Sequence, residues 1–252
     1  MSKKIGIIGG SGLEDPDILG KAETINLATP YGAHSDITVG SIGDVPVAIL
    51  SRHNKKHNLP PAQVNNRANI WALKELGCSH IIASTAAGSL RDEIKPGDLV
   101  LADQFIDFTR LRPVTFFESF PQGEMKHTPM ADPFDDITRN RLADIAEKKQ
   151  LRYHNKGTII TIEGPRFSTR AESHMFRSWG ADLINMSIAP EVILANELEI
   201  PYAVIAMSTD YDCWKEDAEP VSWEAVLETF NNNVHNVLKL MLEYITQYGS
   251  NA

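Results

Sequence analysis

The sequence has few cysteines, no long apolar segment and no excess of basic residues, and each absence excludes a class of protein. Cys78 and Cys213 are the only cysteines in 252 residues, and neither belongs to a Cys-x-x-Cys or Cys/His pattern. Disulfide scaffolds and zinc sites are therefore disfavoured. No stretch approaches the roughly 20 apolar residues that span a membrane, and the N-terminal apolar segment is too short for a signal peptide. We expect a soluble protein of a reducing, cytoplasmic compartment.

The acidic balance and the missing catalytic motifs narrow the function further. A formal net charge of −9 argues against nucleic acid or an anionic membrane as a partner. The sequence contains no His-Glu-x-x-His, no Gly-x-Ser-x-Gly and no Gly-Lys-Ser/Thr motif, which disfavours zinc proteases, hydrolase triads and P-loops. His53 and His57 have the spacing of a helical metal pair, but the following Asn58-Leu59-Pro60-Pro61 disfavours a helix there. We expect no bound metal.

Short apolar segments alternate with amphipathic ones along the chain, a pattern typical of α/β proteins. We expect a single α/β domain over residues 1–252, with a large mixed central β-sheet flanked by helices. Residues 107–134 form the one irregular stretch, and a long loop in a compact domain usually has a function or forms an interface. The predicted strands are residues 4–8, 37–39, 45–50, 80–83, 99–101, 158–162, 183–186 and 203–207. The predicted helices are residues 63–76, 137–149, 169–179, 190–198 and a last helix that begins at Ser222.

Two aspartates one residue apart, Asp210 and Asp212, follow the apolar segment 202–207. The ends of strands are where α/β proteins place their chemistry. A carboxyl group partly shielded there by Tyr211 and Trp214 can have a raised pKa and share a proton with a ligand. An aminopurine presents an acceptor nitrogen beside an amine, which suits a pair of carboxyls. A solvated Asp-rich turn is the simpler alternative.

Two other predicted strands are followed by groups suited to an anion. Gly9-Gly10-Ser11-Gly12 follows the first strand, where glycines admit an oxyanion to the backbone and Ser11 adds a hydroxyl donor. The alternative there is a tight turn that needs glycine. Arg52 and His53 follow the strand 45–50, and an arginine beside a second donor suits phosphate or carboxylate.

Three more strand ends add weaker signals. Ser84-Thr85-Ala86-Ala87-Gly88-Ser89 offers hydroxyls and glycine after a strand, as a second candidate cradle for an anion, although on this signal alone a simple turn is the favoured interpretation. Phe167 follows Glu163-Gly164-Pro165-Arg166 and is either a core residue or suited to stack on a planar ring. Met186 offers a soft, adaptable surface. Together these groups predict a site for phosphate and a nucleoside.

Several segments together resemble the trimeric purine nucleoside phosphorylase family, in particular its branch that acts on S-methyl-5′-thioadenosine. The resemblance implies a purine nucleoside phosphorylase-like fold. It also implies phosphorolysis of methylthioadenosine to adenine and 5-methylthioribose 1-phosphate, with phosphate as a co-substrate and without a cofactor or metal. The matching segments, in the family's order, are residues 5–13, 68–75, 97–98, 103–107, 161–168 and 207–215.

The resemblance also implies a role for individual residues. Asp210 would share a proton with N7 of the purine as the catalytic acid, and Asp212 would read the 6-amino group. His127 would reach the site of a neighbouring subunit, which implies a homotrimer. Ser168 and Trp223 would affect specificity. Trp223 stands where the family usually has a smaller aliphatic residue. The implied phosphate ligands are Ser11, Arg52, His53, Thr85, Ala86 and Ser187, and the other implied substrate contacts are Phe167, Met186 and Tyr211.

Two alternative functions remain open at this point. One is a phosphorylase of 6-oxopurine nucleosides or methylthioinosine. A 6-oxopurine presents a carbonyl that favours an amide donor, so Asp210 and Asp212 favour the aminopurine. The other is a non-catalytic nucleoside-binding protein on the same fold, since a fold alone does not fix a function.

Overall fold

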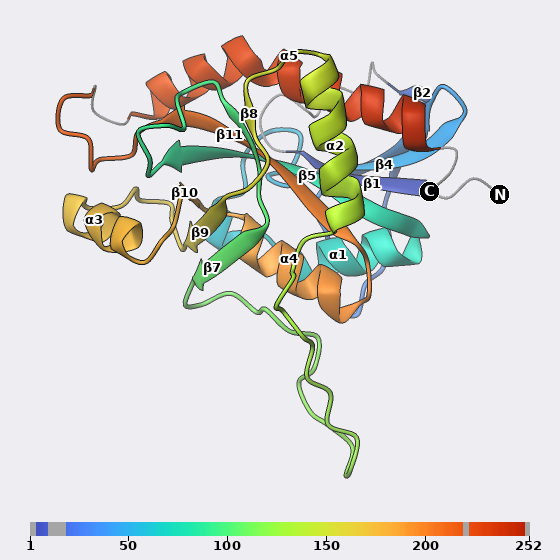
Figure 1. Ribbon diagram of the computed structural model, residues 1–252. Coiled ribbons are helices and arrows are strands. Elements are labelled where there is room, and N and C mark those ends of the chain that lie inside the picture. Colours follow the sequence, from blue (N-terminus) through green and yellow to red (C-terminus); the bar gives the residue numbers. More distant parts are fainter. Residues whose placement is uncertain (1–3, 10–18, 219–221, 250–252) are drawn as a thin grey trace.

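The computed structural model describes residues 4–9, 19–218 and 222–249 and has an α/β architecture (Figure 1). Eleven strands form one mixed sheet. The strands are β1 (Lys4–Gly9), β2 (Gly20–Ile25), β3 (Ile37–Ile42), β4 (Val45–Ser51), β5 (Cys78–Ser89), β6 (Leu99–Leu101), β7 (Gln104–Phe108), β8 (Tyr153–His154), β9 (Thr158–Ile162), β10 (Leu183–Asn185) and β11 (Tyr202–Asp210). The helices are η2 (Pro61–Gln63), α1 (Asn66–Glu75), α2 (Asp136–Lys148), α3 (Arg170–Ser178), α4 (Ile188–Glu197) and α5 (Trp223–Tyr248).

Strand β5 is the centre of the sheet and the point where it branches. Its first half lies parallel to β1 on one side, and residues 81–88 lie parallel to β11 on the other. Its last residues pair antiparallel with β10, where Ser89 lies opposite Leu183. The expected turn after residue 83 is therefore wrong. Thr85 and Ala86 continue the strand because β11 supplies backbone partners for them, and this pairing outweighs the weak strand propensity of small residues.

The central strands are buried on both faces, which explains their nearly continuous apolar sequences. Ile81 and Val204 pack with α1 and α4 on one face, whereas the next residues along, Ile82 and Ile205, pack with α2 and α5 on the other. This alternation is the two-residue period of a strand. Figure 1 shows the two helix pairs on opposite sides of the sheet.

Most helix boundaries follow from local capping. Thr169 and Glu172 form a capping box at the start of α3, and the Ser222 hydroxyl accepts a hydrogen bond from the Ala225 N–H at the start of α5. The start of α1 differs from the prediction. The side chain of Asn65 caps α1, and residues 61–63 form the separate turn η2. Proline explains the break, because Pro61 opens that turn.

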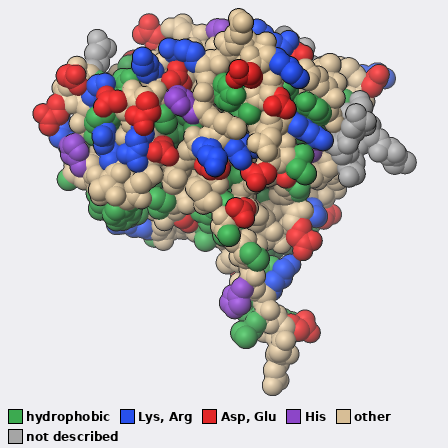
Figure 2. All heavy atoms as spheres, viewed as in Figure 1, with side chains coloured by type: hydrophobic (Ala, Val, Ile, Leu, Met, Phe, Trp, Pro, Cys, Tyr) green, Lys and Arg blue, Asp and Glu red, His purple; other side chains and the backbone are tan. Residues whose placement is uncertain are grey.

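The segment between β7 and α2, residues 109–135, contains no helix or strand and extends away from the body of the molecule (Figure 1). The predicted irregular stretch 107–134 is confirmed, except that residues 107 and 108 belong to β7. Figure 2 shows hydrophobic side chains along this projection, and Leu111 and Met125 are 85% and 76% exposed. Among the described helices, none is long and apolar enough to cross a membrane.

Candidate functional site

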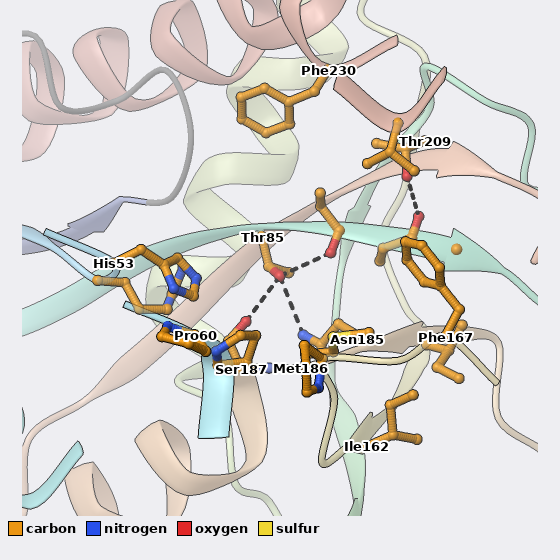
Figure 3. Close-up of a pocket in the computed structure, with 18 of the residues that line it drawn as sticks. His53, Pro60, Thr85, Ile162, Phe167, Asn185, Met186, Ser187, Thr209 and Phe230 are labelled. Atoms are coloured by element: carbon orange, nitrogen blue, oxygen red, sulfur yellow. Dashed lines mark hydrogen bonds between the residues drawn. The ribbon is translucent and has the colours of Figure 1, made fainter. Parts of the chain in front are cut away.

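A cavity with a volume of about 490 Å³ opens where several strands end. Its walls come from the residues that follow β4, from the second half of β5, and from the ends of β9, β10 and β11. The loop of residues 57–61 and two side chains of α5, Val226 and Phe230, complete it. In Figure 3, His53, Thr85 and Ser187 lie toward one end of the cavity, and Phe167 and Thr209 toward the other. This volume is typical of a small-molecule site.

Hydroxyl and amide groups meet at the first end of the cavity. The Oγ atoms of Thr85 and Ser187 are 3.2 Å apart, and the side-chain amide of Asn185 donates to Thr85 Oγ1 at 3.3 Å. The strand pairing of β5 with β11 holds Thr85, and Ser187 stands at the N-terminus of α4. We call this group, together with Arg52 and His53, the anion end. The Thr85 hydroxyl donates to the Ala86 carbonyl oxygen at 3.0 Å, so the two hydroxyls can donate to an oxyanion once they rotate away from their present partners.

Arg52 is the buried member of the anion end and is only 2% exposed. Its Nε and Nη2 atoms donate to both oxygens of Glu191 in α4, and its Nη1 donates to the Ser84 carbonyl at 3.0 Å. The Tyr202 hydroxyl donates to Glu191 at 2.7 Å. Burial by itself would lower the pKa of Arg52, but the Glu191 carboxylate raises it overall. The guanidinium therefore stays charged, and its charge is matched by a carboxylate.

His53 follows Arg52 and is neutral near pH 7. Burial, followed by repulsion from Arg52, lowers the pKa of His53 to about 4. Its Nδ1 atom is 2.8 Å from the Leu59 carbonyl oxygen. Its ring stands 5.2 Å from that of His57, measured between centroids.

The carboxyl pair lies in the same cavity, on the last residue of β11 and just beyond it. Asp210 accepts hydrogen bonds from the Thr209 hydroxyl and from the Asp212 N–H, both at 2.7 Å. Burial raises the pKa of Asp210. Asp212 is 5% exposed, and both of its oxygens are 2.7 Å from the Ser168 hydroxyl. Asp210 is therefore suited to hold a proton, and the Ser168 hydroxyl holds the Asp212 carboxylate in place.

Gly88 of β5 lies directly against the carboxyl pair. A Cβ atom at this position would stand 3.0 Å from Asp210 Oδ1 and 3.1 Å from Ile184 Cγ2. Glycine thus permits the close approach of the carboxyl to the strand. The sequence placed Gly88 in a possible anion cradle, whereas the structure places it beneath the acids.

Comparisons with known proteins agree with this geometry. A family model described as the phosphorylase superfamily matches residues 4–246. The chain belongs to this superfamily. It is 54% identical to the S-methyl-5′-thioadenosine phosphorylase of Xenopus tropicalis, and the match covers 97% of this chain and 88% of that one. It is 51% identical to the S-methyl-5′-thioadenosine phosphorylase of Drosophila melanogaster, and the match covers 96% of this chain and 85% of that one. The structure superimposes on the crystal structure of the methylthioadenosine phosphorylase of Schistosoma mansoni in complex with adenine with a TM-score of 0.92. The two sequences are 42% identical, and the match covers 99% of this chain and 93% of that one.

Most of the site residues that were predicted from the sequence lie together in this cavity. Those that line the cavity are Arg52, His53, Thr85, Ala86, Phe167, Ser168, Met186, Ser187, Asp210 and Asp212. Tyr211 is not among the described lining residues, and its ring packs against Trp214 and under the Lys215 ammonium. His127 also lies elsewhere, beside Phe120 on the projecting segment. Ser11 and the side chain of Trp223 lie outside the described residues.

Several residues of the site were missed at the sequence level. Val226 and Phe230 of the last helix line the cavity, and the sequence does not distinguish them from the apolar residues by which a helix packs on a sheet. Glu191, the partner of Arg52, has a signal that could have found it. It is a single carboxylate in the first turn of an apolar helix, and a buried charge of this kind needs a partner. Among the described residues, no group of three or more His, Cys, Asp or Glu side chains could hold a metal ion.

Proposed function

We propose that this protein catalyses the phosphorolysis of S-methyl-5′-thioadenosine to adenine and 5-methylthioribose 1-phosphate. The observation that carries the proposal is one cavity with the anion end on one side and the buried carboxyl pair on the other. Formation of a phosphorylated sugar needs the anion end, which can hold phosphate. Departure of adenine needs the carboxyl pair, which can protonate the leaving base. The relatives reported above carry this activity in their names, and one Schistosoma mansoni variant structure, 41% identical, contains methylthioadenosine.

The chemistry follows from the charges that form as the bond breaks. Cleavage of the N-ribosidic bond builds positive charge on the sugar and negative charge on the purine. Phosphate at the anion end attacks C1′ and stabilises the sugar, while Asp210 gives its proton to N7 of the leaving adenine. Burial supports this role because it raises the pKa of Asp210. Asp212, held by Ser168, accepts a hydrogen bond from the 6-amino group.

Each implied ligand has a place in this proposal. Ser11, Arg52, His53, Thr85, Ala86 and Ser187 hold phosphate, which is a co-substrate, and no metal or other cofactor takes part. Met186 lies beside the ribose, and Phe167 beside the purine. Phe167 is 40% exposed at the edge of the cavity, and an aromatic ring covered by a bound base gains stacking energy.

The activity is tested by adenine release. We expect release from methylthioadenosine only in the presence of phosphate, and the same rate in a chelator. Methylthioinosine should be a poor substrate because its 6-carbonyl faces carboxyl oxygens. The measurement is a rate assay with methylthioadenosine, adenosine and methylthioinosine, each with and without phosphate. Equal turnover without phosphate would indicate a hydrolase, and a preference for the inosine analogue would favour a 6-oxopurine phosphorylase.

The importance of the position of the Asp210 carboxyl is tested by a substitution at its contact with β5. Gly88→Ala places a methyl group 3.0 Å from Asp210 Oδ1, which forces the carboxyl to shift. Because small misplacements are costly in catalysis, we expect kcat to fall by roughly 10- to 100-fold. Gly20→Ala is the matched control on β2, where the added atom meets Ser41 Oγ at an ordinary 3.4 Å. An unchanged kcat for Gly88→Ala would show that the carboxyl position is not critical.

We propose a homotrimer in which the projecting segment 109–135 contacts the neighbouring subunit and brings His127 to its site. The support is two exposed apolar side chains of this segment, Met125 and, at its base where the backbone N–H donates to Glu163, Leu111, since exposed apolar groups favour an interface. Leu111→Glu with Met125→Glu should dissociate the oligomer and lower activity. Sedimentation velocity checks the mass, and a fully active wild-type monomer would contradict the proposal.

A further inference from the structure

His53 has a fixed tautomer because one of its ring nitrogens faces a carbonyl group. Nδ1 is 2.8 Å from the Leu59 carbonyl oxygen. A carbonyl oxygen can only accept a hydrogen bond, so Nδ1 must donate and must carry the hydrogen. In the neutral ring, Nε2 therefore carries a lone pair and no hydrogen. His53 can offer an anion a donor from Nε2 only after the ring takes up a second proton.

The surroundings oppose that second proton. Burial has the largest effect, and the positive charge of Arg52 and the presence of His57 add to it. The Leu59 carbonyl and the Glu191 carboxylate act in the other direction, but the pKa of His53 still falls to about 4. At pH 7 the neutral ring is favoured by about a thousand to one. The anion end thus contains a hydrogen-bond acceptor, since His53 lines the cavity together with Thr85 and Ser187.

Arg52 does not give this end a net positive charge. Glu191 matches its charge, and both side chains are 2% exposed. Three of the five N–H groups of Arg52 are already used, two by Glu191 and one by the Ser84 carbonyl. The donors left for an anion are the Arg52 N–H groups that are not bonded to Glu191, Ser84 or Tyr202, together with the Thr85 and Ser187 hydroxyls once these rotate away from the Ala86 carbonyl and from each other. An anion here is therefore held by directed hydrogen bonds more than by net charge.

We propose that the anion end selects an oxyanion that carries its own proton, with the P–OH group of monohydrogen phosphate donating to Nε2 of His53. This inference rests on the proposed function, since it concerns how that same site recognises phosphate. Phosphate and arsenate carry an ionisable O–H at neutral pH, whereas sulfate carries none. With sulfate, the lone pairs of Nε2 and of a sulfate oxygen face each other, and an unmade hydrogen bond of this kind weakens binding by roughly 10- to 100-fold.

The proposal predicts a difference in pH dependence as well as in affinity. Sulfate can bind well only when His53 is protonated. Because sulfate binds the neutral ring only roughly 10- to 100-fold more weakly, its affinity should stay level near neutral pH and rise by up to that factor as the pH falls from about 6 through the pKa of His53, about 4. Phosphate brings its own proton and should show no such rise. Isothermal titration calorimetry with inorganic phosphate, arsenate and sulfate, at several pH values, measures both properties on the intact protein.

His53→Gln and Ser187→Ala form a matched pair of variants. The amide of glutamine can rotate to donate to sulfate, so His53→Gln should reduce the preference for phosphate to about threefold or less. Ser187→Ala removes a hydroxyl that donates to either anion, so both affinities should fall and their ratio should persist. A wild-type protein that binds sulfate and phosphate equally, without a pH slope, would overturn the proposal even if His53→Gln failed to fold.

The same preparation separates this inference from the proposed function. Phosphate-dependent adenine release together with equal affinities for sulfate and phosphate would overturn only the role of His53. Absence of phosphate-dependent adenine release would overturn the proposed function and this inference with it. A preference for phosphate that survives His53→Gln would assign the selection to another residue and would also overturn it.

Discussion

Asp210→Asn is expected to reduce kcat for adenine release from methylthioadenosine by about 10²- to 10⁴-fold, the usual contribution of a general acid. Asparagine keeps the size of the side chain and can donate a hydrogen bond to N7, but it cannot transfer a proton. The variant should also discriminate less strongly against methylthioinosine, because an amide can face a carbonyl without repulsion. Steady-state kinetics with both nucleosides measure the two effects.

The pH dependence of kcat distinguishes loss of the transferable proton on residue 210 from a change in the shape of its side chain. Burial raises the pKa of Asp210, so the acid form persists to higher pH than in an exposed aspartate. In the wild type, kcat should fall as the pH rises through this pKa, and Asp210→Asn should lack that decline. Asp92→Asn is the control, since Asp92 is exposed and paired with Lys215. A variant that keeps both its rate and the decline would remove Asp210 from the proton transfer.

Arg52→Ala is expected to lower the free energy of unfolding by about 3–5 kcal/mol, because it leaves the Glu191 carboxylate buried without a partner. It should also raise the KM for phosphate by roughly 10- to 100-fold, the value of a charge-assisted hydrogen bond. Guanidinium unfolding measures the first effect. Arg166→Ala is the matched control, since it breaks an exposed pair with Glu172 and should have little effect on stability.

A double variant separates stability from phosphate binding. Arg52→Met with Glu191→Leu replaces the buried pair by apolar groups, which is often neutral for stability. We expect this variant to unfold near the wild-type midpoint and still to have a raised KM for phosphate. An unchanged KM in this stable variant would remove Arg52 from the phosphate site. If Arg52→Ala and Arg166→Ala cost the same, the buried pair does not stabilise the fold.

The sequence predicted best those elements whose signal is local. The strands 99–101 and 158–162 have the predicted bounds because both faces are buried and every residue is apolar or β-branched. Strand β2 was missed because nearly all of its residues are exposed. Residues 84–89 were mistaken for a turn because their strand conformation depends on pairing with β11, more than 100 residues away.

The site was predicted in the same uneven way. Groups such as Asp210 and Arg52 were found because each follows an apolar strand, and the ends of parallel strands meet at one edge. Their individual roles came from the family resemblance. The pairing of Arg52 with Glu191, across 139 residues, and the contact of Gly88 with Asp210 depend on tertiary packing. The sequence shows such residues but not their partners.

The most direct test of the proposed reaction is to identify its sugar product. Purified protein, methylthioadenosine and phosphate should yield a new phosphorus signal in ³¹P NMR, that of a sugar 1-phosphate, formed in equal amount to adenine. The signal should be absent without phosphate and should appear much more slowly with Asp210→Asn. Adenine formed together with free methylthioribose, and no new phosphorus signal, would contradict phosphorolysis.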